Sequence, residues 1–442
     1  MQPEHRAQPG SQPGGWGSGQ QYGQPAGQPA ARAASRPDGS SAGQGTAASA
    51  QQPPSVPPQV DPQTAGAGSV PTTSSRMTVP GYPSGPAAPA EEKVDTGPLP
   101  SRETLRREAR AASSRRGAGD ADVERAGELL KSVANIFSQR VVGQEQLRRA
   151  LVTALMSSGH ILLESVPGLA KTTAAQTLAS AVSGSFRRIQ CTPDLMPNDI
   201  VGTQILNSST GEMTTQLGPV HANIVLLDEI NRSSAKTQSA MLEAMQERQT
   251  SIGGVVYPLP HPFMVLATQN PIEEEGTYVL PEAQMDRFLM KEVLTYPRPS
   301  EEADVLDRIS NGTFDQPVTG RPISTDDVEW LQRAAERVYV DPVIKQYIVA
   351  LINTSRGGGP RPVPGLDRQV RVGASPRGGI ALMKVAQAVA LQEGRTYVIP
   401  DDVRLLRHGV LRHRLVLTYD ALADGVAPEA IIDAIFAAVP TP

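Results

Sequence analysis

A phosphate-binding loop is the first feature of the sequence that could do chemistry. The letters ESVPGLAKTT (164–173) follow a short apolar run and open a helical stretch. They fit the template GxxxxGK[ST] in Lys171 and Thr172, while Ser165 and Ala170 stand where glycines are usual. In such a loop, backbone N–H groups at the start of the helix cradle phosphates, the lysine reaches the β and γ phosphates, and the threonine hydroxyl joins the Mg²⁺ shell.

The loop predicts ATP as the ligand and Mg²⁺ as its companion ion. An ordinary strand–turn–helix with a chance lysine is the alternative, and the next two motifs argue against it. The residues expected to contact nucleotide are Val166, Pro167, Gly168, Leu169, Ala170, Lys171, Thr172 and Thr173.

Two adjacent carboxylates end the apolar run IVLLDEINR (224–232). A buried strand would place Asp228 at its carboxyl end, where the side chain can hold the water shell of Mg²⁺ together with Thr172. Glu229 would then polarise the attacking water as general base. A surface acidic pair is the alternative, but it is less expected in a strand that follows a phosphate loop.

A third apolar run, FMVLATQNP (263–271), ends in Asn270. A lone asparagine at a strand end is usually a turn former. Its position after the two earlier motifs predicts instead that Asn270 orients the water near the γ-phosphate.

Five short apolar runs must position these residues, and they alternate with helical stretches. Such alternation predicts a parallel sheet covered by helices on both faces, an α/β fold. After about Arg298 the runs stop and several helices follow. We therefore expect an α/β core at 120–298 and a smaller all-α lid domain at 299–442. The runs are ILLE (161–164), FRRIQC (186–191), IVLL (224–227), FMVLAT (263–268) and FLMKEVL (288–294).

Residues 1–119 have a different composition. They are rich in Pro, Gly, Gln, Ser and Ala, lack aliphatic periodicity and include an Arg-rich linker at 101–118. Such a segment cannot bury enough apolar surface to offset the entropy of ordering it, so we predict a disordered tail. The linker is expected to be solvated, with contact to acidic surfaces as the alternative.

Charge and cysteine content exclude some classes of protein. A net charge of −4 argues against a dedicated nucleic-acid or membrane-surface protein. The single cysteine, Cys191, excludes an intrachain disulfide framework and fits a reducing compartment. No apolar run reaches membrane-spanning length and Met1 is followed by polar residues, so we expect a cytoplasmic protein without direct membrane insertion.

Long ordered blocks of the sequence resemble the MoxR family of AAA+ ATPases over nearly all of residues 120–442. In that family alanine is common at the position of Ala170. The resemblance implies an AAA+ P-loop core, an all-α lid, and a ring of subunits, expected to be a hexamer. The blocks are GHILLESVPGLAKT, TPDLMPNDIVG, GPVHANIVLLDEINRSSAKTQSAMLEAMQERQ, ATQNPIEEEGTYVLPEAQMDRF and GASPRGGIALMKVAQAVALQEGRTYVIPDDV.

The resemblance also implies roles for residues outside the three motifs. Arg287 matches the arginine finger that reaches the γ-phosphate of a neighbouring subunit. Arg377 matches the second sensor arginine, which the lid offers to nucleotide in its own subunit. A guanidinium suits both tasks because it stabilises charge on the transferred phosphoryl group; a structural salt bridge is the alternative for each. Val142, Gly143 and Gln144 match the segment lining the adenine pocket.

By the same resemblance, ATP turnover would remodel or mature partner proteins, often proteins with a von Willebrand factor A domain. The TPDLMPNDIVG block matches an insertion that projects toward a central pore and clients. Three alternatives stay open: a metal-chelatase motor subunit, a nucleic-acid motor, and a nucleotide-gated scaffold with little hydrolysis, which the Ser165 departure suggests. Aromatic residues make up only 4% of the chain, so stacking platforms for nucleic acid are scarce.

The remaining candidates for chemistry have simpler explanations. Cys191 is expected to be a small core residue rather than a nucleophile. The acidic run 273–275 is expected to be a solvated loop, and His408 and His413 lack further ligands for zinc nearby.

The composition of the tail generates a test. Deleting residues 1–100 should leave ATP turnover and the melting temperature nearly unchanged, because a segment without periodic apolar residues makes few contacts that the core needs. Turnover and thermal melts of the full and shortened chains would be compared. A fall in melting temperature of about 5 °C or more would show that the tail packs on the core.

Overall fold

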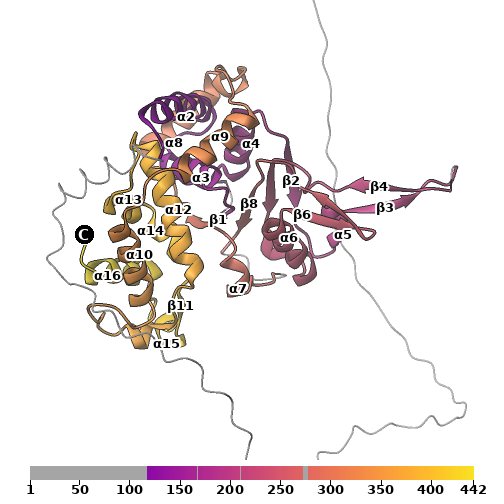
Figure 1. Cartoon of the computed structure of the whole chain (residues 1–442). Helices are drawn as coiled ribbons and strands as arrows, with labels where there is room; N and C mark the ends of the chain where they lie inside the picture. Colours follow the sequence, from indigo (N-terminus) through magenta and orange to yellow (C-terminus); the bar gives the residue numbers. More distant parts are fainter. Residues whose placement is uncertain (1–116, 167, 210, 272–276) are drawn as a thin grey trace, which may run out of the picture. The chain divides into compact units, whose positions relative to one another are not determined.

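A five-stranded sheet forms the centre of the α/β core in the computed structural model, which describes residues 117–166, 168–209, 211–271 and 277–442. Most of the expected tail therefore lies outside the described residues. All neighbouring strands run parallel, in the order β2-β5-β8-β1-β9, which confirms the predicted parallel sheet (Figure 1). The strands are β1 (Ile161–Glu164), β2 (Phe186–Gln190), β5 (Ile224–Asp228), β8 (Met264–Gln269) and β9 (Met290–Val293).

The central strands are buried on both faces. Leu226 of β5 belongs to the same apolar cluster as Leu163 of β1 and Leu266 of β8. Val225 of β5 and Val265 of β8 belong to a second cluster. Successive side chains of a strand point to opposite faces, so a sheet covered on both sides needs the uninterrupted apolar runs seen in the sequence.

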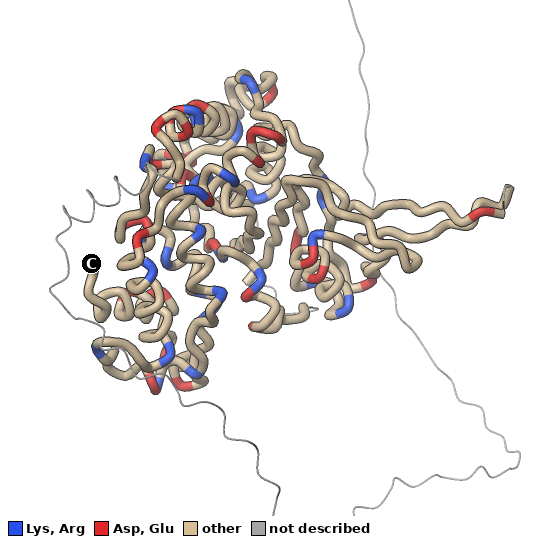
Figure 2. The backbone as a smooth tube through the Cα atoms, viewed as in Figure 1, with Lys and Arg blue, Asp and Glu red and all other residues tan. Residues whose placement is uncertain are grey.

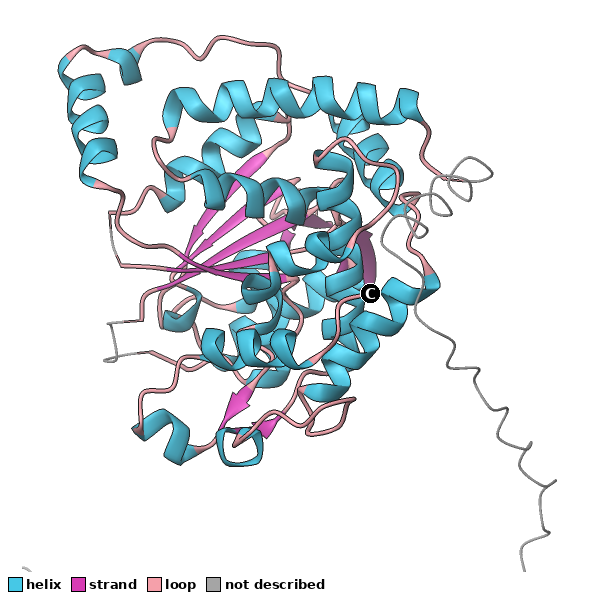
Figure 3. Ribbon diagram, turned by 90° about the vertical axis from the view of Figure 1, so that its left-hand side faces the viewer, coloured by secondary structure: helices cyan, strands magenta, loops and turns pink. Residues whose placement is uncertain are grey.

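Helices cover both faces of this sheet (Figure 3). The first cluster contains buried residues of α2, α3 and α4, and the second contains residues of α5 and α6. The long helix α2 also contacts α9 (Thr325–Glu336) and α12 (Pro376–Gln392) farther along the chain. The helical segments of the core are α2 (Asp120–Arg140), α3 (Glu145–Met156), α4 (Lys171–Ala181), α5 (Pro197–Val201), η1 (Ile230–Arg232), α6 (Ala235–Glu247) and α7 (Glu282–Met285).

The segment after β9 is helical, as expected for the lid. It also contains a short antiparallel ribbon of β10 (Val370–Val372) and β11 (Val416–Leu417), which the all-α prediction did not include. Helix α12 contacts α9, α10, α13 and α14. Within the described residues, no helix is long and apolar enough to cross a membrane. The helical segments are α8 (Pro299–Ser310), η2 (Thr313–Asp315), α9 (Thr325–Glu336), α10 (Pro342–Thr354), α11 (Leu366–Gln369), α12 (Pro376–Gln392), α13 (Pro400–Leu405), α14 (Arg407–Leu411), α15 (Tyr419–Ala423) and α16 (Pro428–Ala438).

Two hairpins extend from the core and were not predicted from the sequence. The first pairs β3 (Gly202–Leu206) with β4 (Met213–Leu217), and the second pairs β6 (Gln249–Ile252) with β7 (Val255–Pro258) (Figure 1). The Tyr257 hydroxyl of the second hairpin donates to Oγ1 of Thr215 in the first at 2.9 Å. The hairpins therefore touch each other.

The burial of the sheet generates a test with two matched leucines. Leu226 is 0% exposed at the centre of the sheet, whereas Leu206 is 58% exposed on β3. Leu226→Ala should lower the free energy of unfolding by about 2–5 kcal/mol because it leaves a cavity between packed layers. Leu206→Ala should change it by about 0.5 kcal/mol or less. Urea unfolding of both variants decides the point, and equal losses would contradict this assignment of the core.

Candidate functional site

The phosphate-binding loop joins β1 to α4. Gly168 has a φ of +88° and Ala170 a φ of +54°, so both residues adopt the left-handed region of backbone space. Glycine adopts it readily, whereas alanine pays about 1–2 kcal/mol, which explains why glycine is usual at the Ala170 position. The turn brings the chain to the first residue of α4, Lys171, and the backbone N–H groups at the start of a helix favour an anion.

Ser165 replaces the expected glycine without backbone strain. Its φ is not positive, and its side chain is buried, with the hydroxyl donating to the carbonyl oxygen of Val166 at 3.0 Å. The Lys171 ammonium donates to the carbonyl oxygen of Ser165 at 3.1 Å. The described part of the loop therefore gives no sign that Ser165 closes it. Pro167 lies outside the described residues.

Asp228 is buried at the carboxyl end of β5 and is held from both sides. Its Oδ2 accepts from Nε of Arg188 at 3.1 Å and from Nη2 of the same residue at 2.5 Å. Its Oδ1 accepts from the Thr268 hydroxyl at 2.7 Å, and that hydroxyl in turn accepts from the backbone N–H of Glu229 at 2.9 Å. One threonine of β8 thus fixes both acidic residues relative to the sheet.

Glu229 follows Asp228 directly and lies at the same edge of the sheet. The residue has a φ of +58°, which turns the chain sharply after β5. Its Oε2 accepts from Nε2 of Gln190 at 3.0 Å and from Nη1 of Arg232 at 3.1 Å. Arg188 and Gln190 both come from β2 and were missed in the sequence, because pairing between strands cannot be read from composition alone.

Asn270 directly follows β8 and is buried. Strand β8 lies between β5 and β1, with Leu227 opposite Ala267 and Glu164 opposite Gln269. The residues after these three strands therefore meet at one edge of the sheet. The phosphate loop, the acidic pair and Asn270 are brought together as the motifs predict.

A cavity of about 810 Å³ lies beside the loop. Six of the predicted nucleotide contacts line it, whereas Gly143, Val166, Lys171 and Thr172 do not. Gly143 instead makes a turn with a φ of +71°, and a Cβ there would meet the Glu301 side chain. The residues that line the cavity are Arg140, Val141, Val142, Gln144, Gly168, Leu169, Ala170, Thr173, Tyr296, Pro297, Glu302, Val305, Leu306 and Phe314.

The apolar end of this cavity comes from residues that the sequence did not identify. Tyr296 precedes α8, Leu306 lies on α8, and Phe314 lies in η2. These apolar side chains suit a flat heterocycle, while the loop residues that line the same cavity suit phosphates. The cavity therefore has both kinds of lining that a nucleoside triphosphate requires.

The donor set at the sheet edge fits Mg²⁺. Thr172 offers a hydroxyl and Asp228 a carboxylate, both oxygen ligands. Mg²⁺ keeps several waters and is usually bound by one or two protein oxygens plus substrate phosphates rather than by a protein cage. The described residues contain no cluster of three or more His, Cys, Asp or Glu side chains that could hold a metal.

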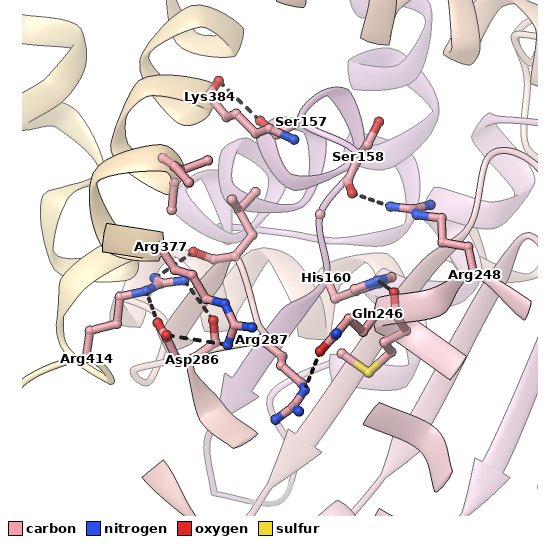
Figure 4. A pocket seen from close by; sticks show the side chains of 15 residues that line it. Ser157, Ser158, His160, Gln246, Arg248, Asp286, Arg287, Arg377, Lys384 and Arg414 are labelled. Carbon is pink, nitrogen blue, oxygen red and sulfur yellow. Dashed lines mark hydrogen bonds and ion pairs between the residues drawn. The ribbon is translucent and has the colours of Figure 1, made fainter. Parts of the chain in front are cut away.

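Arg287 and Arg377 line a second, smaller cavity of about 260 Å³ (Figure 4). Arg287 donates through Nε to Oε1 of Gln246 at 3.0 Å and through Nη1 to the carbonyl oxygen of Ala283 at 3.0 Å. Nη1 of Arg377 lies 3.8 Å from Oδ2 of Asp286. The loop residues Gly168, Ala170 and Thr173 line the first cavity and not this one.

Arg377 was expected to serve the nucleotide of its own subunit. In this structure it lies with Arg287 and not at the cavity beside its own phosphate loop. The physical reason is the position of α12, whose first turn is anchored to Asp286, the residue before Arg287. The two arginines therefore belong to one group in this structure.

The remaining candidates for chemistry, Cys191, His408 and His413, make structural contacts. Cys191 is buried, and that burial raises the pKa of its thiol to about 12, so it carries no thiolate at neutral pH. His408 pairs with Asp433, and Nε2 of His413 contacts the carbonyl oxygen of Phe288. The acidic run 273–275 lies outside the described residues.

Comparisons with known proteins agree with this geometry. Residues 160–290 match a model of the ATPase family associated with various cellular activities (AAA), and residues 366–435 match an AAA lid domain. The chain is 48% identical to Chaperone MoxR1 of Mycobacterium tuberculosis over 68% of this chain and 79% of that protein. It is 31% identical to Protein MoxR of Methylorubrum extorquens over 69% of this chain and 93% of that protein.

A solved structure gives the same result. The crystal structure of a candidate ATPase from Cytophaga hutchinsonii is 40% identical to this chain, with a TM-score of 0.67, and the match covers 76% of this chain and 99% of that one. The relatives, the matched AAA and lid models and the loop at the edge of a parallel sheet point to one family. The chain belongs to the MoxR family of AAA+ ATPases.

Proposed function

We propose that the protein hydrolyses ATP at sites shared between neighbouring copies of the chain. The observation that carries the proposal is the separation of the two cavities. The phosphate loop lines one, while Arg287 and Arg377 line the other. One chain thus has both halves of a site but does not join them. A contact between two different surfaces, repeated from copy to copy, closes into a ring, and a hexamer is the size we propose.

Within one copy, the loop and the sheet edge bind the substrate. Backbone N–H groups at the start of α4 and the Lys171 ammonium hold the β and γ phosphates. Thr172 and Asp228 would hold Mg²⁺, which when bound neutralises charge on those phosphates. Asp228 is already oriented for this by Arg188 and Thr268.

Glu229 and Asn270 act on the attacking water. Glu229 follows Asp228 at the sheet edge, and its carboxylate accepts the proton that the water loses as it attacks the γ-phosphorus. Asn270, buried next to the same edge, orients that water. Arg287 and Arg377 of the neighbouring copy stabilise the charge that spreads over the equatorial oxygens of the transferred phosphoryl group.

We propose that the two hairpins contact protein clients. Ile205, Leu206, Met213 and Leu217 of the first hairpin are exposed, as is Val256 of the second. Glu212 is the sole charged residue of 202–217, and 249–258 contains none (Figure 2). A nucleic-acid motor would need cations on such projections, so an apolar, uncharged surface favours polypeptide. Proteins with a von Willebrand factor A domain are the clients that we propose.

Two further assignments belong to the proposal. We divide the chain into a tail at 1–119, an ATPase core at 120–298 and a lid at 299–442, since β9 is the last strand of the large sheet and α8 begins at Pro299. We assign the protein to the cytoplasm, where a reduced Cys191 would be maintained.

Lys171→Ala and Glu229→Gln should separate binding from turnover. Lys171→Ala should abolish tight ATP binding because the phosphate clamp loses its ammonium. Glu229→Gln should keep binding and slow turnover by about 10²–10⁴-fold, the usual contribution of a general base. Nucleotide titration and phosphate release measure the two effects. Equal loss of binding in both variants would remove the base role from Glu229.

Arg287→Ala and Arg377→Ala should each bind ATP yet turn it over about 10²–10³-fold more slowly, as expected on losing a donor to developing charge. Mixing either variant with Lys171→Ala should restore part of the activity, because Lys171→Ala subunits still offer both arginines. Phosphate release is measured on mixtures whose co-assembly is checked by size-exclusion chromatography with ATP.

The mixtures also decide between action on the neighbour and action within one subunit. An arginine that serves its own subunit cannot be replaced by a neighbour, so its variant would stay inactive at every mixing ratio. Rescue of Arg287→Ala without rescue of Arg377→Ala would return Arg377 to its own subunit and contradict the proposed pair.

A further inference from the structure

Asp286 lies where the core meets α12, directly before Arg287 in the chain. Its Oδ2 accepts from the Ser375 hydroxyl at 2.8 Å, and its Oδ1 accepts from Nε of Arg414 at 2.8 Å. Nη1 of Arg377 is 3.8 Å from Oδ2. Figure 4 shows Arg377, Arg414 and Asp286 grouped beside Arg287. Three groups from the segment after β9 thus converge on one carboxylate of the core.

Ser375 connects this carboxylate to the backbone of Arg377. It is the N-cap of α12, and its Oγ accepts from the backbone N–H of Arg377 at 3.1 Å while donating to Asp286. A cap of this kind fixes the direction in which a helix starts. Two hydrogen bonds through the Ser375 hydroxyl therefore connect the backbone of Arg377 to Asp286, the residue that precedes Arg287.

Arg414 holds the other side of the junction. Its side chain is 3% exposed, and besides Asp286 it donates to the carbonyl oxygens of Phe288 at 2.7 Å and Leu289 at 3.1 Å. These carbonyl groups belong to the two residues that follow Arg287. The backbone on both sides of Arg287 is thereby fixed to the same buried guanidinium.

We propose that Asp286 is a positioning residue that holds Arg287 and Arg377 as one unit for the neighbouring subunit's ATP. This inference rests on the proposed function, because it requires the two arginines to act across a subunit boundary. Asp286 does not touch the substrate. It sets the spacing of two guanidinium groups that must meet the same phosphoryl group, and catalysis is sensitive to displacements of about 1 Å.

The alternative is that Asp286 only joins the core to the lid. Glu282 and Arg371 make such a contact at 3.1 Å, with side chains 54% and 52% exposed, and no hydrogen bond leads from that pair to Arg287 or Arg377 among the described contacts. The two explanations differ in which active site suffers. A structural contact affects the subunit that carries the change, whereas a positioning residue affects only the site of its neighbour.

The test uses full-length chains in mixed rings. The acceptor is Arg287→Ala/Arg377→Ala, which binds ATP but offers no arginines, and the donor is Lys171→Ala, which offers both arginines but binds no ATP. Asp286→Asn, which keeps the size of the side chain and loses its charge, is added to the donor in one mixture and to the acceptor in another. Phosphate release is measured at equal ring assembly.

We expect Asp286→Asn in the donor to lower the restored activity at least about tenfold, and the same change in the acceptor to leave it within about twofold. Glu282→Gln in the donor is the matched control and should have no effect. Ser375→Ala in the donor, which keeps the Asp286–Arg414 pair, should lower the activity in the same direction, and it replaces Asp286→Asn if that variant does not assemble.

Each contrary result has its own meaning. Equal losses in donor and acceptor, or no loss in the donor for either variant, overturn the positioning role while the shared site stands. A parent mixture that assembles and regains no activity overturns the shared site itself, and the inference falls with it.

Discussion

The parallel direction of the five strands is the constraint on which the rest of this structure depends. Because β1, β5 and β8 run the same way, the segments that follow them meet at one edge of the sheet. The loop after β1, the acidic pair ending β5 and Asn270 after β8 are far apart in the chain yet share that edge. The Thr268 hydroxyl strengthens this arrangement, since it joins β8 to Asp228 and to the backbone of Glu229.

A second feature of the structure is that the phosphate loop and the two arginines, Arg287 and Arg377, line different cavities of one chain. The arginine half does not lie on the sheet edge, but on the short segment between α7 and β9 together with the first turn of α12. Its geometry depends on how the lid packs on the core. The placement of the phosphate loop can therefore be understood from the sheet, whereas the apolar lining of its cavity and the placement of the two arginines depend on how the segment after β9 packs on the core.

The sequence predicted the parts of the fold that local patterns determine. Short apolar runs identified all five strands of the sheet, although charged residues interrupt those of β2 and β9, and the phosphate loop was recognisable despite Ser165. The hairpins were missed although Gly253 and Gly254 separate two short β-prone runs, a usual hairpin signal. Which cavity Arg377 lines, and that Leu306 and Phe314 lie beside the phosphate loop, depends on how helices far apart in the sequence pack together. Hydrophobic periodicity does not encode that packing.

The buried ion pair between Arg414 and Asp286 is a contact between the lid and the core whose energetics need an explanation. Removing two charges from water has a large desolvation cost, and apolar replacements for a buried ion pair are often as stable or more so. A gain in the free energy of unfolding is thus a weak explanation for the presence of the ion pair between Arg414 and Asp286. A charged hydrogen bond differs from apolar packing because it is directional, and four of the Arg414 contacts fall on Asp286, Phe288 and Leu289, the residues around Arg287. Directional contacts at these residues constrain the arginine between them, which a nonspecific apolar contact between lid and core would not do.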